Sequence, residues 1–481
     1  MLLNHSLFTN NTKAIFQVLL LVLCIMMGAA IALFSIKKAL IVLSLIIGLI
    51  LIFLCITNFK LGYAIAMGSG FTIFILSRYF MDAFPIGWIV EMLIYSSFIG
   101  LLTDCIINRK SLIGGVYHPI TVFFGLYLLF LVWQAFNPEM NSIVGWFNFF
   151  RRQVMVFLLF ILTSHVIASV NDIKWIFRLW FAFALLSSLY AILTQIFGLP
   201  GFEDAWVMAS SNRQNLYYLV DGFKRKYSLY SDPAAFGMDM AATTLVLVIF
   251  LLMNASPKNK ILFFLLALIC MFGAIYSGTR TAYLMILSGV FLFLLMRGIN
   301  RNTFLIGLGF VMLFIAVMVA PIYDNLFINR IRSAFNFKQD ASLQVRNINR
   351  AKIQPYIHEN PIGGGVYTSG GQGMEYNPEH YLAGFPPDSG YLRAALETGW
   401  VGLVLLLLFH FIILRSGIYA YFHSTDKWIK TAILVATASI FSFVIANYGQ
   451  EPFGQIPSCF LFCICIAIIV KSDKISNNAI T

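Results

Sequence analysis

The sequence is poor in charge, and acidic residues are the scarcest. Charged residues make up 11% of the 481, with 20 Asp and Glu against 32 Lys and Arg. Soluble domains carry about 25% charged residues, so an ordinary soluble protein is excluded. The 60% hydrophobic content and the mean hydropathy of +0.85 indicate an integral membrane protein instead. In so apolar a chain, the net charge of +12 favours anionic lipids or substrates and argues against nucleic acid as a partner.

Patterns that bind metals or form disulfides are also scarce. The seven cysteines all lie in or at the ends of apolar runs, where cysteine behaves as a small hydrophobic residue. No Asp-x-Asp motif occurs on the face predicted below to be outside, so the sequence predicts neither a metal nor another cofactor. Residues 1–13 are polar and precede an apolar run without a small-residue cleavage site, which predicts a retained first span.

Long apolar runs dominate what is present. A membrane-spanning helix needs roughly 20 apolar residues, and continuous runs exclude the alternating pattern of a β-barrel. The fold class predicted is therefore all-α: a polytopic integral membrane protein with about 14 transmembrane helices. The predicted spans lie near 14–35, 39–57, 61–77, 86–107, 119–136, 153–170, 175–198, 235–253, 261–276, 281–296, 303–322, 395–414, 428–447 and 455–470.

The distribution of Lys and Arg in short loops predicts the orientation. Fifteen fall on one side of the predicted spans and six on the other, so the first side and both termini are predicted to be cytoplasmic. Two long hydrophilic loops, about 200–234 and 323–394, are then outside. Four parts follow: N-terminal helices (1–150), central helices with an outer loop at 199–234 (151–322), a large outer loop between the eleventh and twelfth spans (323–394), and C-terminal helices with a short tail (395–481).

Basic residues gather on the predicted outer face, where the positive-inside rule does not expect them. The stretch YSGTRTAYL places Arg280 between two spans, and an arginine at a membrane face costs several kcal/mol unless it is hydrated, paired or directed at an anion. The Arg151-Arg152 pair reaches the same face, and the two long loops carry eleven further Lys and Arg residues. One interpretation is a solvated basic loop surface. The other is a convergent basic cavity, in which the arginine fork suits phosphate.

The larger loop contains a predicted helix and two groups of special residues. ASLQVRNINRAKIQ predicts a short helix with Arg346 and Arg350 one turn apart, which Pro355 should end or kink. The glycines at 363–365 allow either a hinge or a close backbone approach. Asp388 precedes the helix that returns to the membrane, and its carboxylate could either cap that helix or act as a general base toward a sugar hydroxyl.

Three local patterns, in this order and on one face, resemble the bacterial O-antigen polymerase and O-antigen ligase family of membrane glycosyltransferases. The first is KRK (224–226) followed by SDPAAFG (231–237), and the second is YSGTRTA (276–282). The third consists of Arg346, HENPIGGG (358–365) and the stretch from Leu392 to Gly399. Ligases of this family usually have His-Asn where this chain has Asp388-Ser389, which favours a polymerase of O-antigen or exopolysaccharide. A ligase that transfers the glycan to lipid A-core or another acceptor, and a lipid-linked oligosaccharide flippase or transporter, remain alternatives.

The resemblance implies a donor substrate and roles for particular residues. The donor is an oligosaccharide linked to undecaprenyl pyrophosphate at the outer face of the bacterial inner membrane, where membrane lipids surround the enzyme and a chain-length regulator is a further candidate partner. Arg280, Arg346 and Asp388 are the predicted catalytic residues. The predicted substrate-binding residues are Arg225, Arg350, Lys224, Arg151, Arg152, Tyr391 and His380.

Overall fold

The computed structural model describes residues 36–82, 87–219, 222–253, 256–298, 301–322, 324–335 and 341–478. Throughout these ranges the regular secondary structure is helical, and β-pairing is limited to two isolated bridges, Tyr218 with Lys224 and Gly370 with Ala383. The predicted all-α, multi-pass membrane class is confirmed. The first predicted span, 14–35, lies outside the described residues.

The long helices follow the predicted apolar runs. Within the described ranges, ten helices are long and apolar enough to cross a membrane, and three shorter apolar stretches (46–57, 303–319 and 458–472) coincide with the second, eleventh and last predicted spans. The helices are α2 (Ile36–Thr57), α3 (Phe59–Tyr79), α4 (Gly87–Ile107), α5 (Pro119–Trp133), α6 (Ile143–Val166), α7 (Val170–Phe197), α10 (Pro233–Met253), α11 (Pro257–Tyr276), α12 (Arg280–Arg297), α13 (Arg301–Val319), α18 (Gly399–His423), α19 (Lys427–Ala446) and α20 (Ser458–Asn478).

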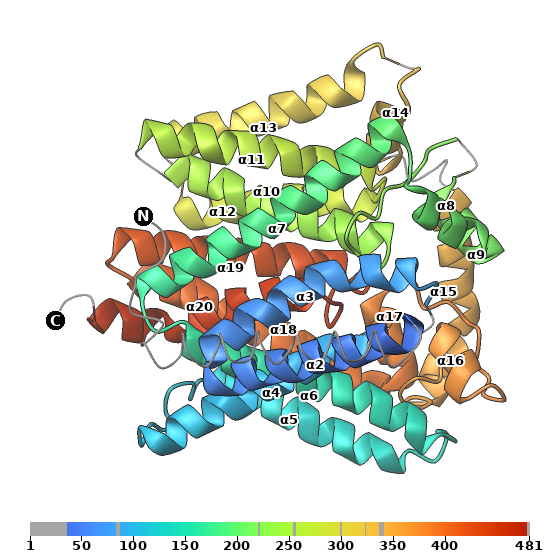
Figure 1. Cartoon of the computed structure of the whole chain (residues 1–481). Helices are drawn as coiled ribbons and strands as arrows, with labels where there is room; N and C mark the ends of the chain where they lie inside the picture. Colours follow the sequence, from blue (N-terminus) through green and yellow to red (C-terminus); the bar gives the residue numbers. More distant parts are fainter. Residues whose placement is uncertain are drawn as a thin grey trace.

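The two long hydrophilic loops contain the other α-helices of the described ranges. The first loop forms α8 (Gly201–Met208) and α9 (Ser211–Tyr217). The second forms α14 (Leu326–Ser333), α15 (Ala341–Glu359), α16 (Gly370–Tyr376) and α17 (Gly390–Glu397). Figure 1 shows α8, α9, α14, α15 and α16 together at the right-hand end of the bundle, so the two loops cover one end of it. We call this the loop end.

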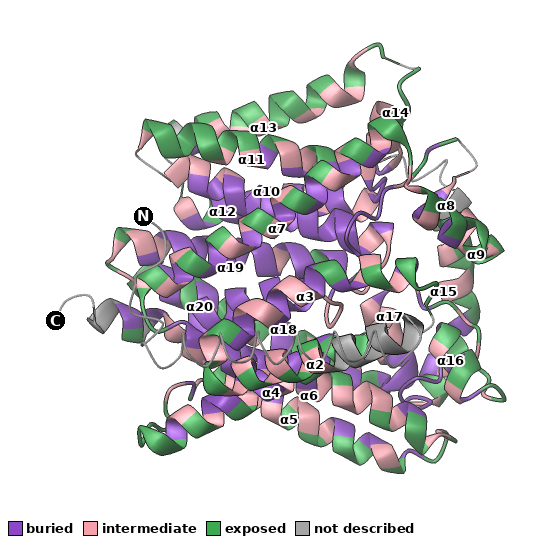
Figure 2. Ribbon diagram, viewed as in Figure 1, coloured by how far each residue is buried: buried purple, intermediate pink, exposed green. Residues whose placement is uncertain are grey.

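The core of the bundle runs through α10 and α19. In each of these helices 78% of the apolar window is buried, against 22% in α5 and α11. Figure 2 shows the same contrast, with buried residues along α10, α19 and α20 and a largely exposed α13 at one edge. An apolar helix exposed in this way is suited to lipid. Because α10 and α19 are held in the core, the segments that adjoin them at the loop end are held in place as well. The candidate site lies at these segments.

A buried ion pair fastens the first loop to the bundle. Arg78, at the end of α3, is 2% exposed and its Nε lies 3.0 Å from Glu203 Oε1 of α8, which is fully buried. The same guanidinium donates hydrogen bonds to the carbonyls of Ser228 and of Tyr230, the latter at 2.9 Å. It also lies 4.5 Å from the ring of Tyr227. One arginine therefore positions both α8 and the turn that leads into α10.

Two of the alternatives predicted for the second loop are wrong. Pro355 does not end its helix, because α15 continues to Glu359. Ile353 and Ile357 on either side of the proline pack with Leu382 and Leu396, and this buried contact outweighs one missing backbone hydrogen bond. The alternative in which Asp388 caps α17 is wrong: the cap is Ser389, whose hydroxyl accepts a hydrogen bond from the Leu392 amide at 3.4 Å.

Candidate functional site

The candidate site begins at the turn between α11 and α12, formed by Ser277, Gly278 and Thr279. The Ser277 hydroxyl accepts a hydrogen bond from the Thr279 amide at 3.1 Å, which closes the turn. Gly278 has a φ of +62°, and a Cβ there would lie 2.7 Å from the Phe223 ring, so the turn requires glycine. Arg280 follows as the first residue of α12 and is partly exposed.

Two more arginines contact this turn from the two loops. Arg225 Nε donates to the Ser277 carbonyl at 3.0 Å and its Nη2 donates to the Thr279 hydroxyl at 3.1 Å. From α14, Arg330 Nε donates to the Gly278 carbonyl at 3.0 Å. Two arginines, Arg225 and Arg330, therefore contact one short turn, and Arg280 is the first residue after it.

The electrostatic cost of this arrangement appears at Arg225. Burial lowers its pKa to about 10, and repulsion from Arg330 and Arg280 acts in the same direction, while Asp232 opposes both. Arg225 stays cationic at neutral pH. Like charges held this close are unfavourable, so the turn is a place where an anion would be stabilised.

Arg346 of α15 also lies near this turn. A Cβ built on Gly449, in the turn after α19, would lie 3.6 Å from Thr281 Oγ1 and 3.9 Å from Arg346 Nη1. Since Thr281 directly follows Arg280, the two predicted catalytic arginines lie at the same end of the bundle, beside one turn.

Asp388 is the acidic partner of Arg346. Arg346 Nε lies 3.7 Å from Asp388 Oδ2, and the two side chains are 27% and 36% exposed. Asp388 has a φ of +52°, an uncommon conformation that aspartate tolerates better than most residues. The next residues hold it there, because the Gly390 amide donates to the carbonyls of Asn447 at 3.0 Å and Gln450 at 3.1 Å.

Arg350 lies one turn along α15 and is bound to the turn after α19. Its Nη1 donates to the Tyr448 hydroxyl at 2.7 Å, its Nη2 donates to the Tyr448 carbonyl at 3.1 Å, and its guanidinium lies 4.5 Å from the Tyr448 ring. Arg350 therefore docks α15 against the turn that carries Gly449. This contact helps to place Arg346.

The Arg151-Arg152 pair lies on α6, away from the α11–α12 turn. Arg151 forms an ion pair with Glu91 of α4 and lies 4.2 Å from the Trp88 ring, so it is bound within the bundle. Arg152 is exposed, and its charge partly offsets the increase that burial causes in the pKa of Tyr367.

The other predicted substrate contacts have local partners. Lys224 is exposed, with its ammonium 5.9 Å from the Tyr218 ring. The Tyr391 hydroxyl donates to the Val444 carbonyl at 2.8 Å. His380 accepts a hydrogen bond from the Leu382 amide at 3.1 Å through Nδ1. Burial lowers the pKa of His380, while Glu139 opposes this shift, so its ring favours the neutral form.

Sequence reasoning did not assign Arg330 or Glu397 to the site. Arg330 was visible only as one of many loop arginines, since nothing in its surroundings in the sequence links it to Gly278. Glu397 is 1% exposed and accepts hydrogen bonds from the Tyr367 amide at 3.1 Å and from Ser369. It fixes the turn that follows the glycines at 363–365, and its place in the family-like stretch from Leu392 to Gly399 was the only signal in the sequence.

Comparison with known families gives a match to part of the chain. Residues 262–407 match the family model described as O-antigen ligase. This segment, less than half of the chain, is similar to the O-antigen ligase family. No curated protein matches the chain.

The matched segment begins within α11 and ends within α18, so it includes Arg280, Arg330, Arg346 and Asp388. The match supports the O-antigen ligase and polymerase family, and with it glycosyl transfer of the O-antigen ligase or polymerase type. Arg225 and Gly449 lie outside the matched residues but contact them. Within the described ranges, no three His, Cys, Asp or Glu side chains gather in a group that could hold a metal ion.

Proposed function

We propose that this protein polymerises oligosaccharide repeat units carried on undecaprenyl pyrophosphate, by glycosyl transfer without a metal ion. The observation that carries the proposal is the meeting of Arg225, Arg280, Arg330 and Arg346, from four separate segments, at one end of a membrane bundle. A diphosphate on a lipid carrier is an anion that reaches such a place from the membrane.

The arginines would stabilise the leaving group. Pyrophosphate gains negative charge as its bond to the sugar breaks, and guanidinium groups that are already in position lower the free energy of that state. Arg280 and Arg346 are assigned to the diphosphate, with Arg225, Arg330 and Arg350 in support. The hydrogen bonds of Arg225 and Arg330 to the α11–α12 turn limit how far their side chains must reorganise.

Asp388 would serve the acceptor. The acceptor hydroxyl oxygen forms a bond to the anomeric carbon of the donor sugar, and the bond from that carbon to the diphosphate oxygen breaks with its electron pair on the diphosphate. The hydroxyl proton passes to the Asp388 carboxylate and later to water. Asp388 lies 3.7 Å from Arg346, so the proposed base is next to one of the two arginines assigned to bind the diphosphate.

The proposed location is the bacterial cytoplasmic membrane, with both termini in the cytoplasm and the loop end outside. The basis is the concentration of Lys and Arg in the short loops of the opposite side. A polymerase is favoured over transfer of a finished glycan to lipid A-core, because Asp388-Ser389 stands where the ligases have His-Asn.

The test uses the full chain in lipid nanodiscs with defined lipid-linked repeat units. Arg280→Ala should lower the rate of polymer formation by about 10²- to 10³-fold, as for loss of one preorganised charge-stabilising group. Arg280→Lys should recover only part of the rate, because lysine keeps the charge but loses the fork. The matched control is Arg178→Ala, an exposed arginine in the N-terminal third of α7, remote from the loop end.

Mass analysis of the products separates the related activities. A polymerase gives a ladder whose steps are whole repeat units, a ligase gives one transfer to an added acceptor, and a flippase forms no new sugar linkage. Normal polymer yield from Arg280→Ala, with the Arg178→Ala control equally active, would contradict the assignment.

A further inference from the structure

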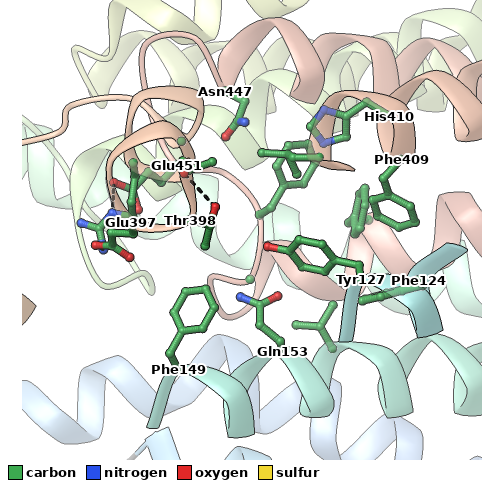
Figure 3. Close-up of a pocket in the computed structure, with 18 residues that line it drawn as sticks. Phe124, Tyr127, Phe149, Gln153, Glu397, Thr398, Phe409, His410, Asn447 and Glu451 are labelled. Atoms are coloured by element: carbon green, nitrogen blue, oxygen red, sulfur yellow. Dashed lines mark hydrogen bonds and ion pairs between the residues drawn. The ribbon is translucent and has the colours of Figure 1, made fainter. Parts of the chain in front are cut away.

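A cavity of about 150 Å³ lies beside the arginines, between α5, α6 and α18. Figure 3 shows Gln153 and Tyr127 pointing into it, with Phe409 and His410 on one side and Glu397, Thr398 and Glu451 on the other. At about 30 Å³ per water, this volume has room for about five waters. It is also of the size of one sugar ring.

Hydrogen-bonding groups without partners face this cavity. Among the described residues, the Tyr127 hydroxyl and the Gln153 amide make no hydrogen bond, and both side chains line the cavity. His410 meets the Tyr391 hydroxyl through Nδ1 at 3.3 Å, which leaves Nε2 without a partner among the same residues. The Asn447 amide nitrogen is buried and also lacks a partner there. Polar groups inside proteins are nearly always hydrogen-bonded, so a set of four needs an explanation.

The positions of these residues on their helices exclude a lipid-facing role. Tyr127 follows Phe124 by three residues and precedes Leu131 by four, so it shares the buried face of α5. Gln153 lies one turn before the buried Val156 on α6, and His410 is 3% exposed on α18. Polar side chains that face the interior of a membrane protein are by default functional.

The remaining lining is aromatic or charge-paired. Phe124, Phe149, Phe409 and Phe453 supply flat apolar surfaces. At the loop end, Arg393 Nε lies 2.9 Å from Glu451 and its Nη1 lies 3.9 Å from Glu397. Two carboxylates share one guanidinium, so this wall has an excess of negative charge. The cavity therefore disfavours a diphosphate and suits a ligand with neutral hydroxyl groups.

The turn after α19 separates the cavity from the arginines. Asn447 and Glu451 line the cavity, whereas Gly449 between them faces Arg346 and Thr281. A ligand in the cavity and a diphosphate at the arginines would be held by opposite sides of one short turn. The two sites differ in charge, and both are needed when a glycan on a diphosphate is the substrate.

We propose that the cavity binds a single neutral sugar ring of the glycan substrate, through the Tyr127 hydroxyl, the Gln153 amide, His410 Nε2 and the Asn447 amide, with the phenylalanine rings against its apolar faces. This proposal rests on the proposed function, because it assigns the sugar-binding part of the same site. A sugar ring carries several hydroxyl groups that both donate and accept, which matches this mixed set.

The test measures binding of methyl glycosides of hexoses and N-acetylhexosamines to the full chain in nanodiscs by saturation-transfer NMR. At least one glycoside should bind the unaltered protein. Tyr127→Phe and Gln153→Leu should each weaken its binding by about 3- to 10-fold, the loss expected for one hydrogen bond. Neither change removes a hydrogen bond seen within the described part of the chain, so folding should be retained. The control is Tyr419→Phe, an exposed tyrosine on α18 beyond the cavity.

Two results would overturn the proposal: no glycoside binds the unaltered protein, or binding is equal in both cavity variants and the control. Farnesyl diphosphate, tested in parallel against Arg280→Ala, probes the arginines alone. If Tyr127→Phe weakens glycoside binding while Arg280→Ala leaves diphosphate binding unchanged, the cavity assignment is supported and the proposed function is contradicted. The reverse result removes only the cavity assignment.

Discussion

Replacing Arg78 with methionine should detach the first loop from the bundle. Arg78 is the only described cation within 4 Å of the buried Glu203 carboxylate, and it also supplies donors to the carbonyls of Ser228 and Tyr230. Methionine fills a similar length of apolar space but leaves all three acceptors without that donor. Since this segment continues from Arg225, the arginine site should lose its order as well.

The loss of stability in Arg78→Met can be estimated from the burial of the ion pair. Removing one partner of a buried ion pair costs about 3–5 kcal/mol, because a buried charge is left uncompensated. The Tyr190 hydroxyl would still donate to Glu203 at 2.9 Å, which favours the lower end of that range. In the double variant Arg78→Met with Glu203→Leu, the unpaired charge is gone. That variant should recover more than half of the lost stability, although the carbonyls of Ser228 and Tyr230 remain unpaired.

The assay is a double-mutant cycle on detergent-solubilised protein, with thermal unfolding and polymer formation measured for each variant. Arg78→Met and Glu203→Leu should each be destabilising, and their effects should be strongly non-additive. The matched control is Arg415→Ala, an exposed arginine on α18. If the two single losses simply add in the double variant, the ion pair does not stabilise the loop as inferred.

Three further outcomes are expected. Asp388→Asn should lower polymer formation by about 10²- to 10⁴-fold without unfolding, because asparagine also tolerates a positive φ; wild-type turnover would remove Asp388 as the base. Gly363→Ala should cost about 1–3 kcal/mol in thermal stability, because φ is +74° and a Cβ would lie 2.6 Å from the Glu397 carbonyl carbon; Gly371→Ala, with open space around it, should be neutral. For His380 the folded-state pKa is lowered, so the unfolded chain takes up protons first and stability is lost as pH falls below about 6.5. The free energy of unfolding of His380→Gln should therefore fall less between pH 7 and pH 5 than that of the unaltered protein. The same pH dependence in both proteins would contradict this prediction.

The membrane-spanning helices were predictable because hydrocarbon demands long apolar runs. The predicted spans 86–107 and 235–253 correspond to helices Gly87–Ile107 and Pro233–Met253. The span predicted at 395–414 is different, since the chain breaks between α17 and α18 at Thr398. Gly399 there has a φ of +65°, and the Trp400 amide donates to the Pro361 carbonyl at 2.9 Å. Hydropathy reports only how apolar a segment is. It therefore could not predict that the backbone of the outer loop packs against this segment and interrupts the helix.

The candidate site was only partly predictable for a related reason. The sequence shows that arginines are abundant in the outer loops, and the family motifs select Arg280 and Arg346. It does not show which arginines are bound to carboxylates. Arg78 and Arg151 pair with Glu203 and Glu91, which lie 125 and 60 positions away in the chain, and only the folded bundle brings them together. Tyr127 looks like one more aromatic residue in an apolar run until its neighbours are known.

The partly exposed contact between Arg346 and Asp388 has a consequence for the order in which substrates bind. Exposed ion pairs contribute only about 0–1 kcal/mol, so a doubly charged lipid diphosphate can draw the guanidinium away at little cost. The carboxylate released by that exchange would then be free to take the hydroxyl proton. A polymerase built in this way would admit its donor first, and the acceptor would react only once the donor is seated.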